Sequence, residues 1–136
     1  MPKRTGDQWS ESKKCALCGD VFVAPSASRK NCDECKDPKS PTGRWVRMKQ
    51  DAKRRRLAFK ITIADVRRFW QKPCTYCGAP TPTVNLDRVD SDYGYVRGNV
   101  VPCCPPCNHL KGVFKVDEFL AHVARVAAFQ NHRKGP

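Results

Sequence analysis

Apolar residues recur at helical spacing in the middle of the chain. In residues 44–58, RWVRMKQDAKRRRLA, the side chains of Trp45, Met48 and Ala52 follow steps of three and four residues, and the other faces are basic. The next apolar stretch starts after Thr62, a residue type that caps helices, with an aspartate three residues later in a capping-box position. The pattern predicts two successive helices, each with one apolar face.

Short apolar runs replace the helical stripes in the stretch that follows. VNLDRV (84–89) and VVPCC (100–104) have the length and composition of strands, while the intervening DSDYGYVRGN (90–99) is too polar for the interior. A short helix should then begin at Cys107. We therefore predict two strands, joined by a long loop and followed by a helix, which is a ββα arrangement.

Residues 116–129 predict a longer helix near the C-terminal end. Its apolar stripe should either pack on the domain or pair with a second chain, so a homodimer is one of two arrangements. The stripe consists of Val116, Phe119, Leu120, Val123 and Ala127.

The N-terminal third has few periodic apolar positions. Residues 1–13 are polar and predict no regular element, whereas VFV (21–23) suits a short strand and DPKSPTG (37–43) has the composition of a linker. These features divide the chain into an N-terminal module with its linker, a basic helical segment, and a ββα domain with a C-terminal helix. The corresponding ranges are 1–43, 44–73 and 74–136.

Cysteine spacing predicts bound metal. The chain has nine cysteines, and eight of them form the four CxxC pairs Cys15/Cys18, Cys32/Cys35, Cys74/Cys77 and Cys104/Cys107. Two such pairs complete a closed tetrahedral four-cysteine zinc site, so we expect two structural Zn²⁺ ions in a small, zinc-stabilised α+β fold. Cys103 is left over, and we prefer Cys104 as the ligand because it keeps the CxxC spacing.

The N-terminus shows no secretory signal, and no apolar run approaches the roughly 20 residues that span a membrane. Disulfides need an oxidising compartment, so this context favours zinc over disulfides. We therefore expect a cytoplasmic protein without a membrane partner.

Positive charge is concentrated in the first half of the chain. The net charge is +13, and residues 1–73 hold 19 Lys/Arg against 8 Asp/Glu, a net of +11. A basic helix beside two zinc modules favours a nucleic-acid partner, because cationic side chains neutralise phosphates and release counterions. The expected contacts are Arg47, Lys53, Arg54, Arg55, Arg56 and Lys111.

The segment LDRVDSDYGYVRGNVVPCCPPCNHLKG resembles the HNH, or ββα-metal, endonucleases, and among them small phage proteins related to phage endonuclease VII. The resemblance covers about residues 57–127. It implies that Asp87 and Asn108 bind a catalytic Mg²⁺ or Mn²⁺, a hard ion that suits their oxygen atoms. It also implies that Asn99 pins the loop by hydrogen bonds without binding metal.

Arg88 departs from the pattern of the better-known members, in which a histidine at this position is the general base. Arginine stays protonated and cannot accept a proton. Three interpretations remain open. Asp90 or His109 is the base, or the divalent ion activates the water while Arg88 binds phosphate, or the protein binds nucleic acid without cutting it.

The leading hypothesis is a metal-dependent DNA endonuclease that nicks or cuts duplex or branched DNA, acting in a bacterial cytoplasm and encoded by a phage or a bacterium. The alternative is a non-catalytic zinc protein that binds nucleic acid and retains the HNH fold. A third hypothesis is a structural RNA-binding protein, against which the set Asp87, Asn99 and Asn108 argues.

Overall fold

The predicted VFV strand is part of an N-terminal sheet, in which its backbone groups pair with those of a second strand. The computed structural model describes residues 3–5 and 8–135. Three antiparallel strands in the order β1-β2-β3 make this sheet, with Glu11 opposite Ala24 and Lys14 opposite Val21. The strands are β1 (Lys3–Thr5), β2 (Gln8–Lys14) and β3 (Val21–Ala24). The prediction that residues 1–13 lack an element was therefore wrong for 3–5 and 8–13, since the polar sequence of β2 is ordered by pairing with β3. Residues 1, 2, 6 and 7 lie outside the described part of the chain.

The linker predicted at 37–43 is shorter than expected. After the short helix α1 (Asp33–Lys36), helix α2 (Pro41–Arg54) begins three residues before the predicted start. The Ser40 side chain accepts a hydrogen bond from the Gly43 N–H at 2.9 Å, and proline suits the first turn. A Cβ atom on Gly43 would lie 1.8 Å from the Asp37 carbonyl oxygen, so this close approach of two backbones requires glycine.

The main core joins α2 to the C-terminal part of the chain. The buried cluster contains Ile61, Val66, Val84, Leu86 and Val100, against which Trp45, Met48 and Phe69 pack. The Trp45 indole N–H donates to the Ile61 carbonyl at 3.0 Å, and Arg44 donates to the Val84 carbonyl at 3.1 Å. Core contacts therefore cross the expected boundary between 44–73 and 74–136, and this division stays a prediction.

Helix α3 (Ile63–Phe69) begins at the predicted capping box, with hydrogen bonds in both directions between Thr62 and Asp65. The ββα unit follows, with a two-stranded antiparallel sheet in which Asp87 lies opposite Val101. Its elements are β4 (Leu86–Arg88), β5 (Val100–Pro102) and α4 (Pro105–Lys111). Both strands are shorter than predicted. Helix α4 starts before Cys107, because Cys104 caps it and a proline occupies its first turn.

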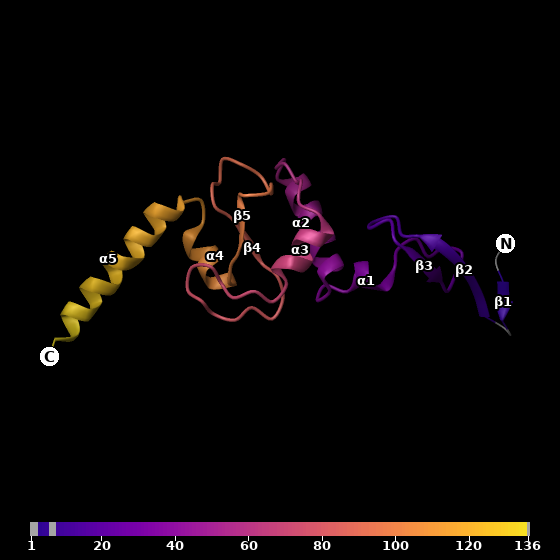
Figure 1. Ribbon diagram of the computed structural model, residues 1–136, viewed down its shortest axis with the longest axis horizontal. Helices are drawn as coiled ribbons and strands as arrows, with labels where there is room; N and C mark the ends of the chain where they lie inside the picture. Colours follow the sequence, from indigo (N-terminus) through magenta and orange to yellow (C-terminus); the bar gives the residue numbers. More distant parts are fainter. Residues whose placement is uncertain (1–2, 6–7, 136) are drawn as a thin grey trace.

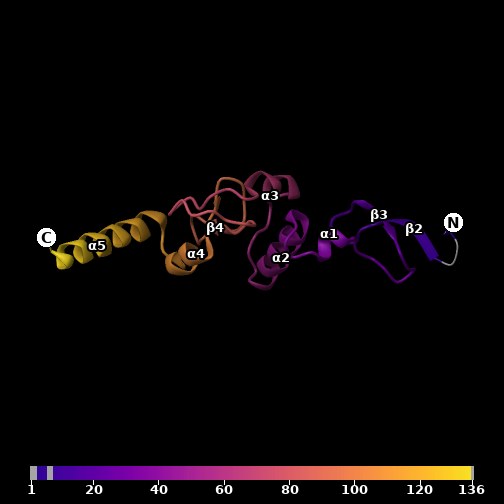
Figure 2. The same cartoon turned by 90° about the horizontal axis from the view of Figure 1, so that it is seen from below.

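The last helix, α5 (Val116–Lys134), leads away from the rest of the molecule, which is elongated in both views (Figures 1 and 2). Of its apolar stripe only Phe119 is buried, against the ring of Tyr76 with the centroids 5.7 Å apart. Leu120 and Val123 are 43% and 45% exposed. Apart from Phe119, the exposed part of the stripe therefore does not pack on the domain as one arrangement predicted. No helix in the described part of the chain is long and apolar enough to cross a membrane.

Candidate active site

Two groups of four cysteines have the geometry of zinc sites. In each group the four Sγ atoms lie within 4.8 Å of one another, and three measured Sγ–Sγ distances are 3.6, 3.8 and 3.6 Å. Tetrahedral zinc with bonds of about 2.3 Å places its sulfur ligands about 3.8 Å apart. All nine cysteines are free thiols. The groups are Cys15, Cys18, Cys32 and Cys35, and Cys74, Cys77, Cys104 and Cys107.

The backbone around each group already favours a thiolate. Burial acts to raise the pKa of Cys15 and of Cys74, but three backbone N–H groups outweigh it at each sulfur and lower the pKa to about 6. Burial and the neighbouring thiols raise the pKa of Cys35 and of Cys107 instead. A second or third thiolate therefore needs a cation beside it, and a dipositive ion would provide that charge.

Cys103 lies outside the second group. It is completely buried, and its S–H donates to the Cys104 carbonyl oxygen at 3.3 Å. The four-cysteine group that could hold a metal ion contains Cys104 and not Cys103, which supports the preference for Cys104. Cys103 packs instead as a small apolar residue against Cys74 and Cys104.

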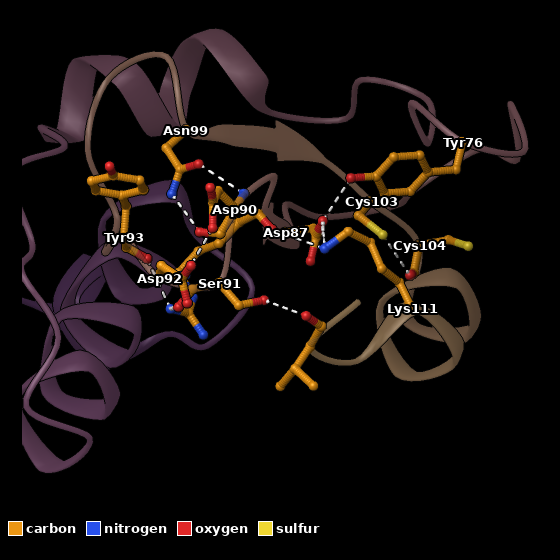
Figure 3. A network of polar contacts seen from close by, with 12 residues as sticks. Tyr76, Asp87, Asp90, Ser91, Asp92, Tyr93, Asn99, Cys103, Cys104 and Lys111 are labelled. Atoms are coloured by element: carbon orange, nitrogen blue, oxygen red, sulfur yellow. Dashed lines mark hydrogen bonds and ion pairs between the residues drawn. The ribbon is translucent and has the colours of Figure 1, made fainter. Parts of the chain in front are cut away.

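Asp87 occupies the interface between β4 and α4. Because successive strand residues alternate between faces, Leu86 enters the core and Asp87 turns toward the helix. Its carboxylate is 4% exposed, and its Oδ2 atom accepts the Tyr76 hydroxyl at 2.6 Å and lies 3.2 Å from the Lys111 ammonium (Figure 3). Burial and the Asp87 contact raise the pKa of Tyr76, so the phenol stays neutral and donates.

Lys111 was predicted to touch DNA, and the structure corrects this expectation. The side chain is completely buried, and its ammonium donates to the Arg88 carbonyl oxygen at 3.0 Å besides its ion pair with Asp87. A buried lysine cannot contact a phosphate in this conformation. Sequence reasoning missed the pair because no local pattern reports which side chain lies across the β4–α4 interface.

Asn108, in the middle of α4, and His109, which follows it, are both exposed. Asn108 precedes Lys111 by three residues, and residues at this spacing share a helix face. The face that carries Lys111 to Asp87 therefore carries Asn108 as well. His109 is one position further around the helix, and among the described residues the polar partners of the Asp87 carboxylate are Tyr76 and Lys111, not His109.

Two predicted site residues, Arg88 and Asp90, are engaged within the loop that joins β4 to β5. The Arg88 guanidinium donates to the carbonyl oxygens of Ser91 and Tyr93, both at 2.8 Å, and lies 5.8 Å from the centre of the Tyr95 ring. The Asp90 carboxylate accepts the backbone N–H of Asp92 at 2.9 Å. Each side chain therefore stabilises the loop.

Asn99 connects the two ends of this loop (Figure 3). Its amide donates to the carbonyl oxygens of Asp90 and Gly94, each at 3.0 Å, and accepts the Asp90 N–H at 2.9 Å. Further along, a Cβ on Gly94 would lie 2.3 Å from the Ala58 carbonyl oxygen, so only glycine permits this approach. The loop is thus fixed both to itself and to residues 58–60.

Replacing Asn99 with alanine should destabilise the protein by about 2–4 kcal/mol, because three hydrogen bonds are lost in a buried position. Urea unfolding monitored by circular dichroism measures the change. Asn131→Ala is the matched control, since Asn131 is exposed on α5 and should shift stability by less than about 0.5 kcal/mol. Equal effects of the two substitutions would contradict this account of the loop.

The remaining predicted nucleic-acid contacts are exposed at α2 and its C-terminal end. Arg54 forms an ion pair with Asp51, and the chain then turns at Arg56, which has a φ of 56°. Residues 58–60 pair directly with residues 94–96, since the Tyr95 N–H donates to the Ala58 carbonyl at 2.8 Å. The basic end of α2 therefore neighbours the loop. These exposed residues are Arg47, Lys53, Arg54, Arg55 and Arg56.

Comparison with known proteins gives few matches. No protein-family model matches the chain. A segment of 82 residues, 58% of the chain, is 33% identical to an uncharacterized protein of Acanthamoeba polyphaga mimivirus, of whose length it spans only 16%. Among solved structures, the rare-cutting HNH restriction endonuclease PacI is similar with a TM-score of 0.53 and 21% sequence identity, over 89% of this chain and 97% of the other.

The structural likeness shows that the chain has an HNH-type fold. The resemblance inferred from the sequence is thereby confirmed at the level of fold, together with a small α+β architecture that carries two four-cysteine groups able to hold zinc.

Proposed function

We propose that this protein is a metal-dependent DNA endonuclease of the HNH type. The observation that carries the proposal is the buried Asp87 carboxylate, which is held at the β4–α4 interface by Tyr76 and Lys111 through Oδ2 alone. Its other oxygen, Oδ1, contacts no donor within the described residues. Asn108 precedes Lys111 by three residues on α4, and we propose its amide oxygen as the second ligand of the ion.

These donors suit Mg²⁺ or Mn²⁺, which bind carboxylate and amide oxygens and keep several water ligands. When bound there, such an ion would neutralise charge on a scissile phosphate and stabilise the leaving oxygen. The other residues of the site orient the proposed ligands. Tyr76 and Lys111 fix the Asp87 carboxylate, while Asn99 and Arg88 shape the adjoining loop.

The hydrogen bonds within the loop reduce the number of candidates for the general base. Arg88 stays protonated and is engaged by two carbonyl oxygens, and the Asp90 carboxylate caps a turn. His109 is exposed beside Asn108, and its imidazole has no hydrogen-bond partner in the described residues. We therefore assign the role of base to His109 as a hypothesis.

DNA is the proposed substrate, and contacts to phosphate would supply affinity without reading sequence. The exposed basic residues at the end of α2 neighbour the loop beside Asp87, which supports a path for the DNA backbone across this side. Duplex or branched DNA, a phage source and a bacterial cytoplasm stay predictions. A homodimer also stays a prediction, based on the exposed apolar residues of α5 such as Leu120 and Val123.

A specific observation favours the alternative, a protein that binds nucleic acid without cutting it. The Lys111 ammonium already neutralises the charge of Asp87, and the guanidinium of Arg88 donates hydrogen bonds to carbonyl oxygens of the loop. In that protein, the buried ion pair would be only a structural element that joins β4 to α4.

Incubation with supercoiled plasmid and with a four-way DNA junction separates the two functions. The endonuclease predicts nicking or cutting with Mg²⁺ or Mn²⁺ and none with EDTA present during the reaction. Tight DNA binding with every metal and no cleavage would support the alternative. Preference for RNA over DNA in competition binding would instead favour the structural RNA-binding hypothesis.

A further inference from the structure

Lys111 forms a contact between α4 and β4 that no exposed charge could make. Its side chain has no exposed surface, and its ammonium lies 3.2 Å from Asp87 Oδ2 and 3.0 Å from the Arg88 carbonyl oxygen. Water screens a buried pair much less than an exposed one, so the positive charge acts strongly on Asp87. Among described side chains, Asp87 has this single cationic partner.

The pair changes what the carboxylate offers to a metal ion. The Asp87 charge of −1 is offset by Lys111, and the other proposed ligand, Asn108, is neutral. Binding of cations to oxygen sites is tuned by the number of charged ligands. The two contacts at Oδ2 also restrict Asp87 to a single available oxygen. A divalent ion at Oδ1 would therefore gain one carboxylate oxygen as a ligand. The Lys111 ammonium at the other oxygen of the same carboxylate would repel this ion.

We propose that Lys111 is an internal counter-ion that keeps the divalent-ion affinity of Asp87 low until a DNA phosphate joins the site. This inference rests on the proposed nuclease function. A phosphate would add a negative charge and oxygen ligands, both of which offset the lysine. The ion would then bind together with DNA rather than before it. Lys111 is a positioning residue, since it acts on the ion through Asp87.

Removing the charge of Lys111 should strengthen ion binding without DNA. Titration with Mn²⁺, followed by the electron paramagnetic resonance signal of the free ion, measures the affinity. We expect Lys111→Met and Lys111→Gln to bind one Mn²⁺ at least about tenfold more tightly than the wild type does. Lys111→Gln keeps a neutral hydrogen-bond donor and is the safer variant for folding. Unchanged or weaker Mn²⁺ binding in a folded variant would overturn the proposal.

Two controls locate the effect. Lys115→Met removes the same charge from an exposed position and should leave Mn²⁺ binding unchanged. Adding Asp87→Asn to Lys111→Gln should abolish the gain in affinity. An equal gain in Lys115→Met, or a gain that survives Asp87→Asn, would mean that general surface charge is responsible and would contradict the role of Lys111.

A measurement on the wild type needs no variant to fold. Amide signals of Arg88 and Asn108 in nuclear magnetic resonance spectra should resist broadening by sub-millimolar Mn²⁺ when the protein is alone. They should broaden once a phosphorothioate DNA duplex, which slows cleavage, is bound. Strong broadening without DNA would overturn the proposal, as would its absence in a DNA complex.

The Mn²⁺ titrations without DNA also test this inference separately from the proposed nuclease function. If the protein never cuts DNA, yet binds Mn²⁺ more tightly at Asp87 when Lys111 is neutralised, the counter-ion role of Lys111 is supported and the nuclease function is refuted. A metal-dependent nuclease whose Mn²⁺ affinity ignores Lys111 would give the opposite result.

Discussion

Asp87→Asn should reduce metal-dependent nicking of plasmid DNA by at least about 100-fold, because the substitution removes the one negative charge offered to the ion while preserving the shape of the side chain. The amide can still accept the Tyr76 hydroxyl on its oxygen. Initial rates of conversion from supercoiled to nicked plasmid at saturating Mg²⁺ measure the loss. A thermal unfolding curve of the same sample shows whether the variant is folded.

Asp87→Ala is a less informative variant for a reason that lies in the structure. It would leave the Lys111 ammonium buried without its partner, and breaking a buried ion pair from one side costs about 3–5 kcal/mol. That is a large part of the roughly 5–15 kcal/mol that stabilises a small domain. Lost cleavage could then reflect unfolding.

The matched control is the double variant Asp87→Ala with Lys111→Met, which removes both charges together. Its stability should lie closer to the wild type than that of Asp87→Ala, while its cleavage should be absent. Wild-type rates of nicking in a folded Asp87→Asn protein would refute the assignment of this carboxylate to catalysis.

Cys104→Ser should unfold the ββα unit and lower the zinc content from two ions per chain to one. Cys104 has two roles, since its sulfur belongs to the second four-cysteine group and also accepts the Cys107 N–H at 3.4 Å at the start of α4. Structural zinc contributes about 10–16 kcal/mol in small zinc domains, which exceeds the stability expected of this unit. Metal analysis after dialysis and the far-ultraviolet circular dichroism spectrum report the two effects.

The neighbouring thiol provides the control for this experiment. Cys103 is fully buried but lies outside both four-cysteine groups, so Cys103→Ala should keep two zinc ions and cost only about 1 kcal/mol of packing. If Cys103→Ala lost one zinc ion and Cys104→Ser kept both, Cys103 rather than Cys104 would be the zinc ligand.

Elements with a local signal could be predicted from the sequence. The capping box at Thr62 and the four CxxC pairs depend on residues that are close in the chain, and the structure contains them as expected. The helix over α2 was also predicted, but its start was misplaced because Pro41 and Gly43 resemble linker residues when the Asp37 backbone beside them is unknown.

Features that depend on tertiary contacts could not be predicted. The burial of Lys111 follows from the packing of α4 on β4, and its sequence context reads only as a charge near a helix end. The turn of Arg88 toward two loop carbonyls likewise depends on the path of a loop that has no regular pattern. The exposure of the α5 stripe is a similar case, since amphipathicity does not reveal whether a partner surface exists.

Helix α2 contributes to two clusters, and this shared membership has a thermodynamic consequence. Val46 packs in the cluster of the first four-cysteine group, Met48 packs against the main core, and Trp45 contacts both. Zinc bound at the first group would therefore order a helix that the main core also requires, which would lower the entropy that the core must lose on folding. The two metal ions should accordingly bind with positive cooperativity, although no ligand is common to both sites.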